Sequence, residues 1–301
     1  MIPKSVILTG SKKPEAFSDG HAIPSSVAQV AVVIRYELLN YFRSRRFFVL
    51  LAIELIIASA LTGVNAYYGI NAFGSNPLGF YTSWFGSGVL GSPAAYIVLF
   101  SAILFGGDAI SGEFQNKTGY FVTANPVQRS ALYVGKWVAA LAASLLIFGM
   151  FSAIALGNAA YYFGLAAFPY ELGESLLFSV VYVVAILGIT FFFSSLFKNS
   201  SMSILVSAVL FVFGFPLIQE IVSSIIRIEP WFILTYGSGI ISSILTVPYP
   251  AHVFASGRDA FTGISVVQYN PTVFEGLGIM LVYFAITFAL GLAIFERKEF
   301  N

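Results

Sequence analysis

Long apolar stretches alternate with short polar ones along most of the chain. An apolar helix of about 20 residues crosses the hydrocarbon layer of a membrane. We therefore expect six transmembrane helices, at Phe47–Tyr67, Ala94–Ile110, Trp137–Tyr161, Leu176–Phe197, Met202–Ser223 and Val273–Phe295. The link between the fourth and fifth, Lys198–Ser201, is so short that these two helices must form a tight hairpin. The pattern predicts an all-α integral membrane protein.

A different pattern precedes the first apolar stretch, over Val27–Arg46. Apolar residues recur there at steps of three and four and share one helical face, namely Val27, Val30, Ala31, Ile34, Leu38, Tyr41 and Phe42. Glu37 and Arg43 lie away from that face, and Arg45 and Arg46 directly precede the apolar run. This pattern favours a helix lying in the membrane interface, with its arginines near lipid phosphates. The alternative is an ordinary positively charged flank of the first span.

The longest polar interruption between two of the expected spans runs from Gly106 to Lys136. It carries charges of both signs at Asp108, Glu113, Lys117, Arg129 and Lys136, and breaks between short helical runs at Gly112, Gly119 and Pro126. Glu113 and Lys117 are four residues apart, so they could pair with each other on one helix face. Charged groups in such a loop could equally pair across an interface with another protein. The sequence leaves both interpretations open.

Two further segments are apolar or aromatic without matching a simple span. Tyr68–Pro93 is rich in glycine, serine and aromatic residues, which favours an external interfacial loop. Trp231–Tyr249 is apolar enough to cross a membrane, but Pro230 and Pro248 bracket it, and glycines and hydroxyl residues weaken it. We interpret it as an external re-entrant or interfacial helix rather than a seventh span.

The placement of lysine and arginine predicts the orientation, since these residues are enriched in cytoplasmic loops. With six spans and the N-terminus inside, 13 of the 15 lysines and arginines are cytoplasmic, and only Arg227 and Arg258 are external. A seventh span would give 12 against 3, so charge alone does not reject it. We expect both termini in the cytoplasm, residues 1–26 forming a flexible tail.

Composition agrees with a membrane protein and gives little support to catalysis. Hydrophobic residues make up 58% of the chain and charged residues 10%, against about 25% charged in soluble domains. Cysteine is absent, and the two histidines, His21 and His252, are far apart, so we expect no metal site. No phosphate-binding GxxxxGK[ST] loop, GxSxG or HExxH motif is present. We expect no catalytic residue and no enzyme activity in this chain.

Two acidic residues are candidates for a polar site inside the membrane, where charges are costly. Glu54 lies about a third of the way along the first span, and Asp108 lies near the end of the second. Glu54 could line a substrate path, or it could be a buried carboxyl group hydrogen-bonded to a neighbouring helix.

The order of these features resembles an ABC-2 type permease, the membrane subunit of an ABC transporter. An amphipathic elbow helix precedes the first span, and a cytoplasmic loop follows the second. The specific likeness lies in that loop, in Ser111–Phe114, Lys117–Gly119, Asn125–Arg129 and Gly135–Lys136. The resemblance covers about residues 27–298 and sets residues 1–26 apart, so we expect a membrane domain at 27–301.

In such permeases the loop and the elbow rest on a separate ATPase subunit, which binds ATP and Mg²⁺. The resemblance therefore implies that this chain binds no cofactor itself, binds no nucleic acid, and pairs with ATPase subunits and a second permease copy or paralogue. The implied coupling-loop contacts are Gly112, Glu113, Phe114, Asn116, Lys117, Pro126 and Arg129. The implied elbow contacts are Arg35, Glu37, Arg43, Arg45 and Arg46.

The function implied is ATP-driven export across the plasma membrane by alternating access. Two alternatives remain: a membrane anchor in a larger export or maturation complex, and a secondary transporter. The latter predicts paired broken helices around functional intramembrane charges.

Overall fold

A computed structural model describes residues 25–69, 76–86, 93–116, 127–258 and 265–298. Six long helical segments form the bundle: α2 (Arg45–Tyr68), α4 (Pro93–Ala109), α7 (Arg129–Phe163), α8 (Tyr170–Leu196), the run from α9 to η4 (Ser200–Ile226) and α13 (Val273–Arg297). Among the described residues, five of these are long and apolar enough to cross a membrane, whereas α4 has only 17 residues. These segments correspond to the six expected from the sequence.

The shorter elements fill the ends of the bundle. They are α1 (Ser26–Arg43), α3 (Pro77–Phe85), α5 (Ser111–Gln115), η2 (Gly164–Ala167), α11 (Leu234–Gly237) and α12 (Ile240–Ser243). An antiparallel hairpin of β1 (Val253–Arg258) and β2 (Ser265–Tyr269) pairs Val253 with Tyr269. The fold is therefore predominantly helical, as expected, with one small hairpin that the hydropathy pattern did not indicate.

Three helices, α4, α7 and α8, form the inner part of the bundle. Most residues of α4 are buried, and in the most apolar 18-residue stretch of each helix 50% of α7 and 61% of α8 are buried, against 22% of α2 and 11% of α13. Close approach depends on small residues, because a Cβ on Gly188 of α8 would lie 2.8 Å from the Thr287 hydroxyl of α13. The exposed faces of α2 and α13 are apolar and suit contact with lipid or with another chain.

The segment between α2 and α4 departs from the expected external loop. Helix α3 begins with Asn76, whose side chain accepts from the Gly79 amide, and Pro77. Its aromatic side chains Phe80, Tyr81, Trp84 and Phe85 are buried. The Tyr81 hydroxyl also donates to the Ala167 carbonyl at 2.8 Å. The abundance of aromatic residues, taken for an interface signal, instead builds a packed helix; residues 70–75 and 87–92 lie outside the described residues.

The segment Trp231–Tyr249 contains two four-residue helices, α11 and α12, rather than one continuous helix. Leu234 and Ile240 are completely buried. The Ser175 hydroxyl of α8 donates to the Ile241 carbonyl at 2.7 Å, which fastens α12 to the bundle. A segment broken in this way does not span a membrane as a helix, in line with the interpretation preferred from the sequence.

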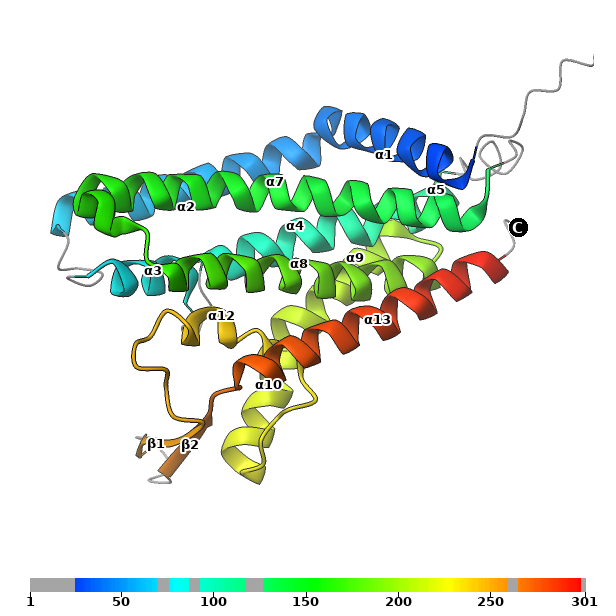
Figure 1. Cartoon of the computed structure of the whole chain (residues 1–301). Coiled ribbons are helices and arrows are strands. Elements are labelled where there is room, and N and C mark those ends of the chain that lie inside the picture. The colour runs from blue at the N-terminus through cyan, green and yellow to red at the C-terminus, as the bar shows by residue number, and fades with distance from the viewer. Residues whose placement is uncertain (1–24, 70–75, 87–92, 117–126, 259–264, 299–301) are drawn as a thin grey trace, which may run out of the picture.

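Two helix boundaries differ from expectation and matter for function. The elbow and the first span are separate helices because Ser44 is extended, and its hydroxyl accepts from the Phe47 amide at 3.2 Å. Helix α7 begins at Arg129, not at Trp137, and is 35 residues long. The run Ser200–Ile226 consists of α9 (Ser200–Val209), the π-helical η3 (Leu210–Gly214), α10 (Phe215–Glu220) and the π-helical η4 (Ile221–Ile226). Figure 1 shows its second half leaving the bundle.

Candidate functional site

The candidate site is the end of the bundle where α1, α5 and the C-terminal end of α13 gather, here called the α5 end (Figure 1). Helix α3 lies at the opposite end, here called the α3 end. The α5 end unites segments that are far apart in sequence, including the expected elbow and the expected coupling loop. Its contacts decide whether those segments move separately or together.

Lys136 of α7 lies at the centre of this end. Its ammonium group pairs with Glu37 of α1 and with Glu113 of α5, the latter at 2.8 Å. The Lys136 side chain is 4% exposed, so the three charges are stabilised mainly by one another and little by water. We call these three residues the Lys136 cluster. It joins the elbow, the short helix and the long inner helix.

The cluster corrects two expectations. Glu113 pairs with Lys136, a contact that the sequence did not indicate, while Lys117 lies outside the described residues. Lys136 was expected at the end of a polar loop, but α7 has already begun, so the residue is buried within a helix. Glu37 was placed away from the buried face of its helix, but α1 packs through the face that carries it. The Glu37–Lys136 ion pair, which a hydropathy profile does not register, determines which face of α1 packs against α7.

Packing and hydrogen bonds hold α1 along α7 on both sides of the cluster. A Cβ on Gly135 would lie 2.7 Å from the Val33 side chain, so only glycine lets the helices come this close. The buried Gln29 side chain accepts from the Gln128 amide at 3.0 Å, capping the start of α7. Ser26 donates to the Gln128 side chain at 2.9 Å.

Tyr41 joins α1 to α4. Burial, together with the negative charges of Glu37 and Asp108, raises the pKa of Tyr41 well above its usual value. The hydroxyl therefore stays protonated, and it donates to the Phe105 carbonyl at 3.3 Å. This bond fixes the elbow to α4 as well as to α7.

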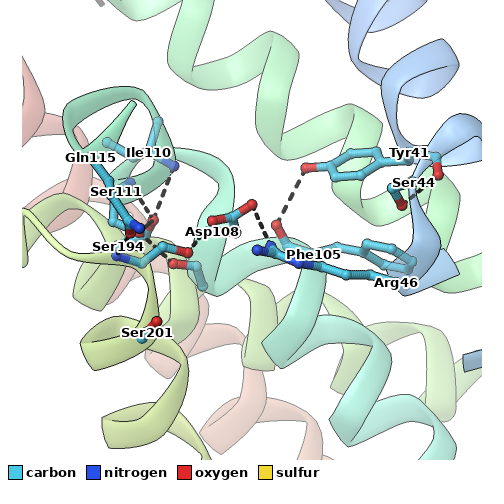
Figure 2. A network of polar contacts seen from close by, with 12 residues as sticks. Tyr41, Ser44, Arg46, Phe105, Asp108, Ile110, Ser111, Gln115, Ser194 and Ser201 are labelled. Carbon is cyan, nitrogen blue, oxygen red and sulfur yellow. Dashed lines mark hydrogen bonds and ion pairs between the residues drawn. The ribbon is translucent and has the colours of Figure 1, made fainter. Parts of the chain in front are cut away.

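Asp108, at the end of α4, lies between two other helices (Figure 2). Its carboxylate pairs with Arg46 of α2 on one side and accepts from the Ser200 hydroxyl of α9 on the other. A Cβ on Gly112 would lie 3.0 Å from one Asp108 oxygen, so glycine leaves room for the carboxylate. Asp108 thus joins α4 to α2 and to α9.

The turn from α4 into α5 is held by α8. The Ser194 hydroxyl accepts from the amides of Ile110 and Ser111, at 3.0 and 2.9 Å (Figure 2). The amide of Ser200 donates to the Gln115 side chain at 2.9 Å. These bonds satisfy backbone groups that a helix end leaves without intrahelical partners. Helix α5 is consequently fixed at both of its ends.

The C-terminal end of α13 closes the α5 end from the other side. The Lys298 ammonium donates to the carbonyls of Ser195, Leu196 and Phe197 and so caps α8. It also lies 4.3 Å from the centre of the Phe114 ring. Arg129 donates to the carbonyls of Glu296 and Lys298, at 2.8 and 3.0 Å.

The residues expected to contact an ATPase fall into two groups. Gly112, Glu113, Phe114 and Arg129 have partners within the chain, as do Glu37 and Arg46 of the elbow. Asn116, Arg35, Arg43 and Arg45 are exposed. Lys117 and Pro126 lie outside the described residues. Sequence reasoning did not identify Ser194, Ser200 or Lys298 as part of this end, since isolated serines and a terminal lysine carry no local signal.

Glu54 stands apart from the α5 end, within α2. It is 1% exposed, and within the described part of the chain neither carboxylate oxygen has a hydrogen-bond partner. The hydrogen bond to a neighbouring helix that the sequence suggested is therefore not made among these residues. A buried, unpartnered carboxylate is costly unless it is neutral or meets a partner.

Several long apolar helices, packed through buried ion pairs at one end, define a multi-pass membrane protein. Comparison with family models identifies which kind: the model described as ABC-2 family transporter protein matches residues 31–300. The chain therefore belongs to the ABC-2 transporter family. No curated protein matches the chain.

Proposed function

We propose that this chain is the membrane-spanning subunit of an ATP-driven exporter in the plasma membrane, powered by separate ATPase subunits that bind ATP and Mg²⁺. The observation that carries the proposal is the Lys136 cluster. Through it, a displacement of α5 or α1 acts directly on α7, one of the inner helices of the bundle. Family membership supports the same role.

The exposed residues of the α5 end supply the docking surface in this proposal. Asn116 ends α5 and is exposed, and Arg35, Arg43 and Arg45 are exposed on the elbow and at the start of α2. The residues behind them, including Glu113, transmit the displacement rather than contact the ATPase. This division separates docking from coupling, which the sequence alone assigned to the same residues.

The α5 end faces the cytoplasm in this proposal, because the lysine and arginine bias places its loops inside. Single cysteines test the orientation against a background without cysteine. We expect Lys198→Cys at the α5 end to react with an impermeant thiol reagent only from the cytoplasmic side. Val247→Cys, 62% exposed in the segment after α12, should react only from outside. Reaction of both from the same side would contradict the orientation.

A second permease copy or paralogue completes the transporter in this proposal. The low burial of α2 and α13 supports it, since these helices offer apolar surface beyond what one chain covers. Glu54 lies on α2, so a partner chain or a substrate is a source of the contact it lacks.

Docking is tested by placing bulk on the exposed end of α5. We expect Asn116→Trp to abolish co-purification of the ATPase subunit and substrate-stimulated ATP hydrolysis in liposomes. Val247→Trp, an equally exposed site in the segment after α12, is the matched control and should leave both unchanged. Full assembly of the Asn116→Trp protein would contradict docking at α5. ATP hydrolysis by the pure single chain would contradict the dependence on a separate subunit.

A further inference from the structure

A second polar cluster, far from the α5 end, joins three segments near the start of α13. It consists of Glu229, after η4, His252, before β1, and Glu275, in the first turn of α13. One ligand atom from each lies within 4.8 Å of the other two. The Glu229 carboxylate and His252 Nε2 are 3.2 Å apart. The three residues come together only through the fold, since 46 positions separate the first from the last.

Each member of the cluster is held by one atom, which directs another toward the centre. Tyr236 donates to Oε1 of Glu229 at 2.6 Å, and Oε2 is the atom nearest His252. The Thr272 amide donates to Oε2 of Glu275 at 3.2 Å, within the capping box of α13. Metal-binding carboxylates and histidines are usually oriented by second contacts of this kind.

The histidine is oriented in the same way. His252 Nδ1 lies 2.8 Å from the Asn270 carbonyl, and because a carbonyl oxygen only accepts, Nδ1 carries the proton. With a proton on Nε2 as well, the ring donates to the Glu229 carboxylate at 3.2 Å; without that proton, the Nε2 lone pair is open to a cation. Backbone pairing of the Asn270 amide with the His252 carbonyl at 2.8 Å holds the two residues together.

The cluster therefore brings two carboxyl groups and an imidazole nitrogen close together. Two carboxylates and an imidazole lone pair repel one another unless a proton or a cation lies between them. A zinc ion bound at about 2.0–2.2 Å to each would set the ligand atoms about 3–3.5 Å apart, close to the Glu229–His252 separation. Three protein ligands and an open position are a common zinc arrangement.

We propose that Glu229, His252 and Glu275 bind a divalent transition metal, with zinc as the best match. The imidazole favours zinc over magnesium or calcium, which prefer six or more oxygen ligands. Bound metal would tie the segment after η4 and the start of the hairpin to the first turn of α13. This site is independent of the proposed transport function, and under the proposed orientation it lies at the outer face.

The test is zinc binding by the full chain, purified in detergent with a tag free of histidine and stripped with a chelator. Competition with a chromophoric chelator should show one zinc per chain, and Co²⁺ should give a visible d–d absorption. We expect His252→Ala and Glu275→Gln each to weaken binding at least about tenfold, since even outer contacts contribute 10–100-fold. Glu275→Gln retains an oxygen for the capping box, so it keeps the helix start intact.

The matched control is His21→Ala, which removes the only other histidine and should bind zinc like the unaltered chain. Zinc should also raise the thermal unfolding temperature of the unaltered chain and of His21→Ala, but not that of His252→Ala. Equal zinc affinity of the His252→Ala and His21→Ala proteins, both folded by size-exclusion chromatography, would overturn the proposal. So would failure of the unaltered chain to bind zinc or cobalt.

Discussion

Two buried acidic sites in this chain have opposite surroundings. Glu37 and Glu113 share the Lys136 ammonium group, whereas Glu54 is buried among apolar residues without a hydrogen-bond partner in the described part of the chain. The first site is complete within one chain. The second is incomplete, and its cost to folding is not offset there. We infer from this difference that the α5 end is stable within one chain. The surface of α2 is the place for contact with another chain or with substrate.

The largest expected effect comes from removing the shared cation. Lys136→Met leaves two carboxylates facing each other with little water, and breaking a buried pair typically costs about 3–5 kcal/mol. Thermal and denaturant unfolding in detergent would measure the loss. Lys198→Met, at an exposed lysine of the same end, is the control and should change stability little. Restoring stability by adding Glu37→Gln and Glu113→Gln would confirm the charge argument; equal stability of the two lysine variants would refute it.

Removing one of the two acids should have a smaller effect. Glu113→Ala leaves Lys136 paired with Glu37, so we expect a loss of about 1.5–3 kcal/mol, as for a hydrogen bond to a charged group. Lys117→Ala should cost less than Glu113→Ala, because the Glu113–Lys136 pair remains in that variant. A double-mutant cycle between positions 113 and 136 measures the coupling directly. Strong coupling of 113 to 117, with none to 136, would restore the interpretation made from the sequence.

At Glu54 we expect a substitution to raise the stability of the protein rather than lower it. Replacing a buried carboxyl group that lacks partners with an apolar side chain removes a desolvation cost, so Glu54→Leu should raise stability by about 1–2 kcal/mol. Glu174→Leu, at an exposed glutamate near the start of α8, is the control and should stay within about 0.5 kcal/mol. A marked loss of stability in Glu54→Leu would show that the carboxylate has a stabilising partner, and the comparison between the two acidic sites would then fail.

The smallest effect is expected at Asp108. Arg46 and Asp108 are 47% and 33% exposed in their side chains, so water screens the pair. Arg46→Ala should cost about 0.2–1 kcal/mol. Comparing unfolding at low and high salt should show the difference shrinking as salt rises. A loss of stability that does not depend on salt and is as large as that of Lys136→Met would contradict this prediction. It would show that the Arg46–Asp108 pair behaves like the buried Lys136 cluster.

Much of the fold follows from hydropathy, because length and apolar composition fix where helices cross a membrane. Each of the six expected stretches overlaps a long helical segment, five of which are long and apolar enough to span, and α1 lies where a helix was expected from the period of three to four residues. The start of α7 at Arg129 was missed because its first two turns contain polar residues. A hydropathy profile does not distinguish such a polar helical turn from a loop. The hairpin and α3 were missed because their short, mixed sequences resemble interfacial loops.

The candidate site was predictable by region but not by contact. The charges of Glu37, Glu113 and Lys136 are visible in the sequence, and the loop motif marks the region. Their pairing depends on how α1 lies against α7, which close contact at Gly135 and the cap from Gln29 determine. The sequence predicted no metal site because the two histidines are distant, but the proposed cluster of Glu229, His252 and Glu275 needs only one histidine.

Because α7 is long, a small tilt at its anchored end produces a large displacement at its other end. Its 35 residues make a rod about 52 Å long at 1.5 Å per residue. The Lys136 cluster holds α7 near one end, about two helical turns from its start at Arg129. If the rod pivots at Lys136, its far end at Phe163 lies about 40 Å away, so each degree of tilt moves that end by about 0.7 Å. A short helix of five residues can thus govern displacements of several ångströms on the opposite side of the bundle.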